Sequence, residues 1–259
     1  MIELKSVYKT WDHGRSYTVK DVSFTVQSGS VLALLGGSGS GKSTIVKMIN
    51  RLIEPSRGSI KIDGEEITTV DPVLRRRRIG YVFQGIGLFP QMTVGEDIAV
   101  VGKLQGKGHE LSATRIDELL DLVQLPPDKF RERYPHEMSG GQRQRVGFAR
   151  AVATNSRIML LDEPFGALDP VTRDDLQQQF VSLQRNLGLT AVIVTHDMSE
   201  ALLLADTIAV LHNGELLRIG SGRELLTNPG HEYVRLMLDT PRRHAEQLHE
   251  LMSNPGQGT

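Results

Sequence analysis

A glycine-rich segment, Gly36–Ser43, offers the clearest chemistry in this chain of 259 residues. It fits the pattern G-x-x-x-x-G-K-[ST], with the apolar run Val31–Leu35 before it and a helical pattern over residues 42–52 after it. Glycines let backbone N–H groups point at an anion, Lys42 adds a positive charge, and the Ser43 hydroxyl can ligate Mg²⁺. The segment predicts a phosphate-binding loop for a nucleoside triphosphate, against the alternative of a flexible glycine–serine loop. The residues expected to contact the nucleotide are Gly36, Gly37, Ser38, Gly39, Ser40, Gly41, Lys42, Ser43 and Thr44.

Two adjacent carboxylates follow another apolar run. Residues 157–161 have the pattern of a buried strand, and Asp162 and Glu163 come directly after it. Sheets of α/β proteins bind ligands at the carboxyl ends of their strands. Asp162 is therefore placed to hold Mg²⁺, and Glu163 to orient and polarise an attacking water. Acidic residues commonly end strands, so this pair alone is weak evidence. The phosphate loop elsewhere in the chain is what supports a role for it in nucleotide hydrolysis.

A third candidate is the segment Ser139-Gly140-Gly141-Gln142, which precedes a helical pattern that continues to residue 153. The spacing of Ser139 and Gln142 predicts a capping box at the start of that helix. Two glycines at a helix start also expose N–H groups to an anion at the positive end of the helix dipole. The two interpretations are compatible.

Strand and helix patterns alternate around these segments, which predicts an α/β fold with a mainly parallel sheet and helices on its faces. From about residue 90 to 154 the pattern becomes helical, beginning with a capping box at Thr93 and Glu96, so we expect a helical insertion. The strand patterns lie at residues 17–26, 31–35, 58–63, 79–83, 157–161, 190–195 and 207–211, and further helical patterns at 170–187 and 198–205.

Taken together, these motifs and their order resemble the ATP-binding cassette (ABC) family over residues 1 to about 240. The resemblance implies a P-loop NTPase core, an N-terminal antiparallel β-subdomain and an inserted α-helical subdomain at about 90–154, followed by a tail over 241–259. It also implies that ATP and Mg²⁺ bind between two cassettes that meet head to tail. In that arrangement the phosphate loop of one subunit is completed by Ser139 and Gly141 of the other.

The same resemblance assigns roles to single residues. Trp11 stands where the family has an aromatic residue that stacks on adenine, although Tyr17 is a nearby competitor and ordinary packing is the alternative. His196 ends the strand pattern at 190–195 and stands where the family senses the γ-phosphate. The residues implied in catalysis are Lys42, Gln84, Glu163 and His196; those near Mg²⁺ are Ser43, Gln84 and Asp162; those at the dimer interface are Ser139, Gly140, Gly141, Gln142 and Asp169.

Within the family, several short sequence segments resemble those of the importers of quaternary amines such as glycine betaine, carnitine and choline. The segments that carry this likeness are 48–55, 86–90, 133–139 and 162–169. The resemblance implies integral-membrane permease subunits that dock near Gly85–Asp97, and an extracytoplasmic solute-binding protein that acts indirectly. Several relatives continue into paired CBS domains, for which too few residues remain before Thr259, so ionic-strength sensing through such domains is not expected.

The composition of the chain excludes several classes of function. A formal net charge of −1 gives no sign of a nucleic-acid partner, and the basic run Arg75–Arg78 is expected to be a solvated face. Without cysteine, disulfides and thiolate metal sites are excluded. The most apolar stretch, residues 201–211, is broken by Asp206 and is shorter than the roughly 20 residues of a membrane span. With no secretory signal at the N-terminus, we expect a peripheral subunit at the cytoplasmic face of the inner membrane.

Other functions remain open at this point. They are a cassette importing another solute, an exporter cassette, a soluble ABC ATPase of DNA repair, chromosome maintenance or translation, and a small-molecule kinase. Coiled-coil, zinc and second-cassette insertions, which soluble ABC ATPases usually carry, are not visible in the sequence. The Ser139–Gln142 segment argues against the kinase.

Overall fold

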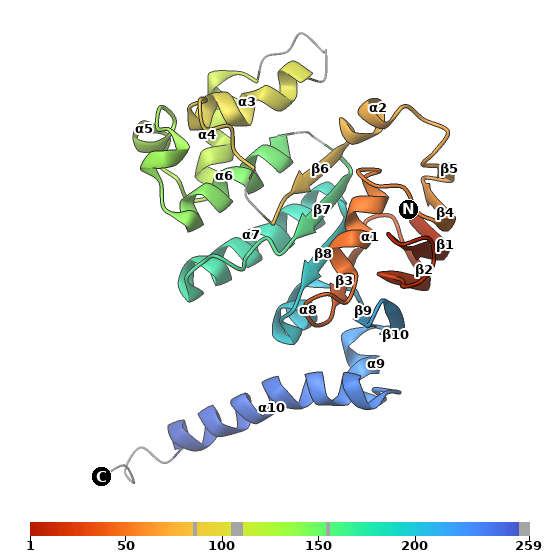
Figure 1. The fold of residues 1–259 in the computed structure, drawn as a ribbon. Helices are drawn as coiled ribbons and strands as arrows, with labels where there is room; N and C mark the ends of the chain where they lie inside the picture. Colours follow the sequence, from red (N-terminus) through yellow and green to blue (C-terminus); the bar gives the residue numbers. More distant parts are fainter. Residues whose placement is uncertain (85–86, 105–110, 154–155, 254–259) are drawn as a thin grey trace.

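Two sheets form the framework of the protein (Figure 1). The computed structural model describes residues 1–84, 87–104, 111–153 and 156–253, without the side chains of 244–245 and 248–253. The larger sheet has six strands in the order β10-β9-β3-β8-β7-β6, all parallel except β10. Its strands are β3 (Val31–Leu35), β6 (Ile79–Val82), β7 (Ile158–Asp162), β8 (Thr190–Thr195), β9 (Thr207–His212) and β10 (Glu215–Gly220).

The smaller sheet is antiparallel and has the order β2-β1-β4-β5. Its strands alternate buried and exposed positions, as expected for a sheet with one face on the core. By contrast, β3, β7 and β8 are buried at every position, because helices cover one face of the parallel sheet and the helix Lys42–Ile49 together with the smaller sheet covers the other. The strands of the smaller sheet are β1 (Ile2–Lys9), β2 (Val19–Val26), β4 (Arg57–Ile62) and β5 (Glu65–Glu66).

Several helices lie outside the helical insertion, and some of them pack on the parallel sheet. α1 follows the glycine-rich loop and packs on β7 and β8, and α8 packs on β3 and β8. α7 begins at a proline directly after its N-cap Asp169, whose carboxylate accepts a hydrogen bond from Thr172 N–H at 3.0 Å. The helices are α1 (Lys42–Ile49), α2 (Pro72–Arg76), α7 (Pro170–Leu187), α8 (Met198–Leu204), α9 (Gly222–Thr227) and α10 (Glu232–Ser253).

A group of helices stands to one side of the parallel sheet, opposite the antiparallel sheet (Figure 1). Both predicted capping boxes are present: Thr93 and Glu96 exchange hydrogen bonds of 2.9 and 3.3 Å, and Ser139 and Gln142 exchange bonds of 3.0 and 3.2 Å. The group consists of α3 (Val94–Leu104), α4 (Ala113–Leu122), α5 (Pro127–Phe130), a 3₁₀ turn at Pro135–Glu137 and α6 (Gly140–Ala153).

Several elements go beyond the sequence expectations, among them the two-residue strand β5 and the short helix α9. The antiparallel edge strand β10 and the short helix α2 were not anticipated, and α10 continues through residue 240, where a tail was expected to start. The expectation for the basic run was wrong for Arg75, which is buried and pairs with Glu65 at 3.3 Å. Folding of residues 72–76 into α2 turns this side chain inward. Within the described residues, no helix is long and apolar enough to cross a membrane.

Candidate functional site

Four neighbouring strands of the parallel sheet end at one edge, and each is followed by a predicted site residue. The strands lie in the order β3, β8, β7, β6, and their register pairs Leu35 with Thr195, and Asp162 with Val194. Because all four run in the same direction, their carboxyl ends form one continuous edge. The residues that follow them are Gly36, His196, Glu163 and, two positions after β6, Gln84. The fold therefore gathers groups that are distant in sequence.

The glycine-rich loop wraps around the ammonium group of Lys42. The Lys42 Nζ donates hydrogen bonds to the carbonyl oxygens of Gly36 and Gly37, both at 2.7 Å, and to Ser40 Oγ at 3.2 Å. Burial lowers the pKa of Lys42, while the nearby carboxylates of Glu163 and Asp162 act in the opposite direction. An anion in the loop would therefore meet a desolvated cation that is already held in place.

Close backbone contacts explain two of the loop glycines. A Cβ at Gly36 would lie 2.2 Å from the carbonyl oxygen of Leu211 at the end of β9, and one at Gly41 would lie 2.6 Å from that of Thr18. Gly41 also has φ +98°, a conformation that favours glycine, and it is the N-cap of α1. The loop thus requires glycine for reasons of packing as well as of phosphate access.

Ser43 and Asp162 lie side by side, as expected for shared metal ligands. The Ser43 hydroxyl donates a 2.9 Å hydrogen bond to Asp162 Oδ1. Burial raises the pKa of Asp162, and this hydrogen bond opposes the effect. A hydroxyl and a buried carboxylate are hard oxygen donors of the kind that Mg²⁺ takes, so the pair fits that ion. Among the described residues no group of three or more His, Cys, Asp and Glu could hold a metal, so phosphate oxygens and water would have to complete its coordination.

Glu163 and His196 face each other at the same edge. His196 Nδ1 lies 3.6 Å from Glu163 Oε1, and both side chains are reachable from solvent. Glu163 has φ +50°, which is uncommon for a residue with a side chain. Such strain persists only where the surroundings hold the backbone in place.

Gln144 provides that restraint, although no sequence motif pointed to it. From α6 its buried amide nitrogen donates to the carbonyl oxygens of Glu163, at 3.0 Å, and Pro164, while its Oε1 accepts a 3.3 Å bond from Ala167 N–H. The available signal was a glutamine two positions after Gln142 on the inner face of a helix. A buried amide on that face needs partners, but only the fold shows which ones.

Trp11 lies mostly at the surface. The residue is 65% exposed, and Lys9 Nζ lies over its ring, 4.4 Å from the centroid. Tyr17, the competitor, is only partly exposed, and its ring packs edge-on against Tyr8 at 5.6 Å. Exposure favours Trp11 as the stacking residue.

The segment Ser139–Gln142 starts α6, which packs against α3, α4 and β6, whereas α1 packs on β7 and β8. Within the described chain no hydrogen bond joins this segment to the phosphate loop. Asp169 acts as the N-cap of α7, and hydrogen bonds from Thr172 lower its pKa. Neither motif completes the phosphate loop of its own chain, so both stay predictions for a contact with a second copy.

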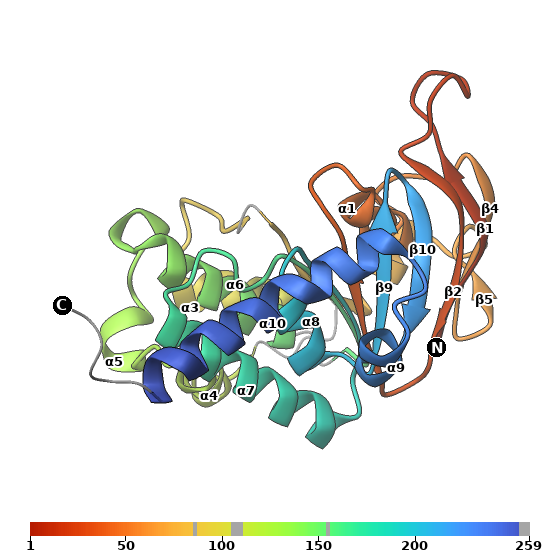
Figure 2. The same ribbon diagram turned by 90° about the horizontal axis from the view of Figure 1, so that it is seen from below.

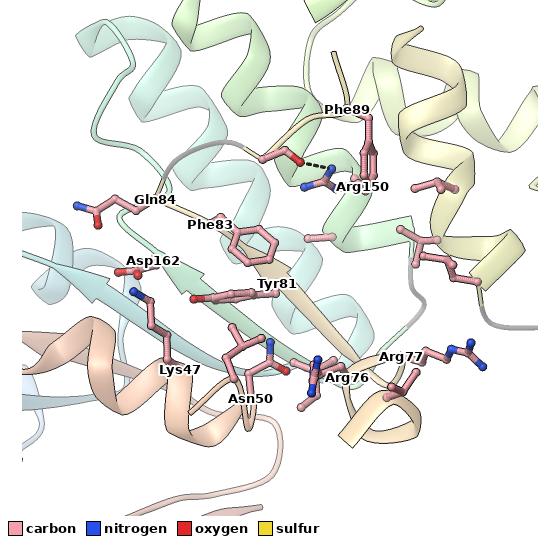
Figure 3. A pocket seen from close by; sticks show the side chains of 18 residues that line it. Lys47, Asn50, Arg76, Arg77, Tyr81, Phe83, Gln84, Phe89, Arg150 and Asp162 are labelled. Carbon is pink, nitrogen blue, oxygen red and sulfur yellow. Dashed lines mark hydrogen bonds between the residues drawn. The ribbon is translucent and has the colours of Figure 1, made fainter. Parts of the chain in front are cut away.

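Gln84 borders a large groove between the parallel sheet and the helical group (Figure 3). The groove has a volume of about 820 Å³, and Asp162 and Gln84 lie together at one end of it. Its lining combines apolar and basic side chains, among them Leu52, Phe83, Phe89, Val101, Lys47, Arg76 and Arg77. Of the segment expected to contact a partner, Gly85–Asp97, Gly85 and Ile86 lie outside the described residues.

The sequence of the chain matches a known family. Residues 19–166 match the family ABC_tran, described as ABC transporter. The chain belongs to the ABC transporter family. Its solved structural relatives include a dimeric ATP-binding cassette, MJ0796, in a post-hydrolysis state bound to ADP and Pi, with a TM-score of 0.79 and 35% sequence identity over 85% of this chain and 98% of that one. The predicted ABC cassette fold is therefore confirmed.

Several curated ABC proteins are similar to this chain. It is 49% identical over 242 residues to the "Glycine betaine/carnitine/choline transport ATP-binding protein OpuCA" of Bacillus subtilis, covering 93% of this chain and 63% of that protein. It is 48% identical over 235 residues to the "Glycine betaine uptake system ATP-binding protein YehX" of Escherichia coli, covering 91% of this chain and 75% of that protein. The predicted resemblance to quaternary-amine transport ATP-binding proteins is thus confirmed.

Proposed function

We propose that this chain is the ATP-hydrolysing subunit of an ABC importer that takes up quaternary amine osmoprotectants such as glycine betaine, carnitine or choline. One observation carries the ATPase assignment: the loop that holds Lys42, the Ser43–Asp162 pair and the facing side chains of Glu163 and His196 share one edge of the sheet. The direction of transport and the solute class are supported by the relatives, whose names state glycine betaine, carnitine or choline transport.

In the proposed reaction, the loop amides and Lys42 bind the β- and γ-phosphates of ATP. Mg²⁺ would be held by Ser43 and Asp162, with Gln84 nearby, and would neutralise phosphate charge. A water attacks the γ-phosphorus, its proton passes to the Glu163 carboxylate, and the bond to the β–γ bridging oxygen breaks to give ADP and phosphate. His196 donates a hydrogen bond to a γ-phosphate oxygen. Positioning and charge stabilisation supply most of the rate in this class of reaction.

The site is completed by a second cassette. Ser139, Gly140, Gly141 and Gln142 of one copy would contact the γ-phosphate held by the other, with N–H groups at the start of α6 facing the anion, and Asp169 would lie at the interface. The dimeric form of related cassettes supports this arrangement. ATP then closes the dimer and hydrolysis opens it.

The groove next to Gln84 is the proposed contact with a permease. Its apolar side chains suit a short amphipathic helix, and the basic groups of Lys47, Arg76 and Arg77 on its lining suit acidic residues on that helix. Because Gln84 and Asp162 lie at one end of the groove, the binding or hydrolysis of ATP would change the contacts of a helix bound there. The chain would therefore work as a peripheral subunit at the cytoplasmic face of the membrane, with a solute-binding protein on the other side.

Reconstitution tests the whole proposal. The chain is combined in vesicles with its candidate permease and solute-binding protein, and ATPase activity is measured with a panel of quaternary amines and with unrelated amino acids and sugars. We expect stimulation by at least one quaternary amine and by none of the unrelated solutes. Stimulation by an unrelated solute alone would overturn the substrate assignment but keep the ATPase. Absence of any ATP hydrolysis would overturn the ATPase itself.

A further inference from the structure

The first turn of the C-terminal helix touches the phosphate loop. The Tyr233 hydroxyl accepts a 3.2 Å hydrogen bond from the backbone N–H of Gly37. The Tyr233 ring lies against the imidazole of His212, with centroids 4.1 Å apart and planes tilted by 35°. His212 ends β9, whose preceding residue Leu211 already contacts Gly36 closely. Tyr233 is therefore held between the loop and the strand beside it.

Apolar residues of α10 near Tyr233 also pack against the elements around the phosphate loop. Val234 and Leu238 of α10 are buried in one cluster with Leu35, which ends β3 before the loop, and with Met198 and Ala201 of α8, the helix that follows His196. Figure 2 shows α10 crossing α8. The helix thus packs on the strand that leads into the phosphate loop and on the helix behind His196.

We propose that Tyr233 is a positioning residue for the phosphate loop, through which the C-terminal helix α10 is coupled to ATP binding. The hydroxyl fixes the Gly37 peptide at the start of the loop, while the amides farther along remain available to phosphate. A loop held in its binding conformation before ATP arrives loses less conformational freedom on binding. Coupling between two sites is reciprocal, so ATP must also stabilise the start of α10. This inference rests on the proposed binding of ATP at Gly36–Ser43.

The substitution Tyr233→Phe removes the hydroxyl and keeps the ring on His212. We expect ATP to bind the variant roughly two- to tenfold more weakly in calorimetry, the range of one net hydrogen bond. KM for ATP should rise while kcat stays near that of the parent. The matched control is Tyr134→Phe, since Tyr134 also stacks on a histidine, His136, but lies in the helical group. A thermal unfolding midpoint equal to that of the parent would show that the variant is folded.

Hydrogen–deuterium exchange tests the reciprocal effect. In the parent, addition of Mg²⁺ and ATP should slow amide exchange both in the phosphate loop and over residues 232–238, and in the Tyr233→Phe variant the effect on 232–238 should be lost. An ATP affinity of Tyr233→Phe equal to that of the parent, with unchanged protection of α10, would overturn this inference. Failure of the parent chain itself to bind ATP would instead overturn the proposed function.

Discussion

The imidazole Nδ1 of His196 lies 3.6 Å from the carboxylate Oε1 of Glu163, at the ends of the neighbouring strands β8 and β7. In the proposed reaction, this spacing would place Glu163, as acceptor of the water proton, next to His196, as donor to a phosphate oxygen. Glu163 adopts a left-handed backbone conformation there, with Gln144 bonded to its carbonyl group. A backbone held in this way fixes where the Glu163 side chain leaves the main chain.

The first prediction concerns Glu163. Glu163→Gln keeps the side-chain shape but removes the proton acceptor, so we expect turnover to fall roughly a hundredfold or more. ATP binding should persist, and ATP should trap a closed dimer that is visible by size-exclusion chromatography. Glu118→Gln, an exposed carboxylate of α4 paired with Arg115, is the matched control. Hydrolysis by Glu163→Gln at the parental rate would show that another group accepts the proton.

Lys42 is the subject of the second prediction. Lys42→Ala removes the buried ammonium group that the loop carbonyls surround, so the phosphates lose a charged partner worth roughly 1.5–3 kcal/mol. We expect ATP affinity to fall by at least about tenfold in calorimetry. Lys129→Ala on α5 serves as the exposed control. Equal ATP affinity of the two variants would contradict the assignment of the phosphate loop.

A third prediction uses Trp11, the single tryptophan of the chain. Stacking on adenine should change its fluorescence when ATP is added, and Trp11→Ala should weaken ATP binding by roughly 1–3 kcal/mol. Trp11→Phe should keep most of the affinity because it keeps an aromatic face. If Tyr17→Ala weakens binding and Trp11→Ala does not, Tyr17 is the stacking residue instead.

The fourth prediction is the pH dependence that follows from the raised pKa of Asp162. In the folded protein this carboxyl keeps its proton above its ordinary pKa of 3.8. Without ligands, its contribution to the stability of the fold is therefore fully present below pH 3.8 and is lost as the pH rises through the folded-state pKa. Mg²⁺ needs the ionised form. The gain in ATP affinity from Mg²⁺ should therefore shrink on acidification while the pH is still above the ordinary range of an aspartate.

Calorimetric titrations with ATP, each with and without Mg²⁺, would follow this effect over a pH series. Asp162→Asn should abolish the Mg²⁺ gain at every pH, since it lacks the titrating ligand. A Mg²⁺ gain in the parent that stays constant down to the ordinary aspartate range would contradict a raised pKa at this site.

A fifth prediction concerns the buried ion pair of Asp97 and Arg150. Their atoms lie 2.9 Å apart, Asp97 also accepts a 2.7 Å bond from Phe89 N–H, and Arg150 donates to the Gly87 carbonyl oxygen at 2.8 Å. The pair thus ties α3 and α6 to the segment that follows Gln84. Asp97→Ala leaves a buried cation without its carboxylate, so we expect a loss of roughly 3–5 kcal/mol in the free energy of unfolding.

Urea unfolding measures that loss. The control is Asp117→Ala, which breaks the more exposed pair with Arg131 and should cost at most about 1 kcal/mol. Similar losses for the two variants would show that the buried pair does not hold this segment.

Much of the site was predictable because its residues follow short, regular patterns. The loop before Lys42 and the carboxylates after β7 each combine an apolar run with a local motif, and a parallel sheet brings the ends of such runs together whatever the sequence between them. Gln144 and Tyr233 were missed for the opposite reason. Neither belongs to a motif, and their partners, Glu163 and Gly37, are 19 and 196 positions away.

Local spacing and residue type were enough to predict the alternation of strands and helices, the phosphate loop, both capping boxes and the family resemblance. The folded structure was needed to show that Arg75 is buried, that α10 reaches the loop, and that Ser43 donates a hydrogen bond to Asp162. These contacts depend on how the elements pack, and packing is a property of the whole chain. The contact between the C-terminal helix and the phosphate loop therefore cannot be predicted from any short segment of the sequence.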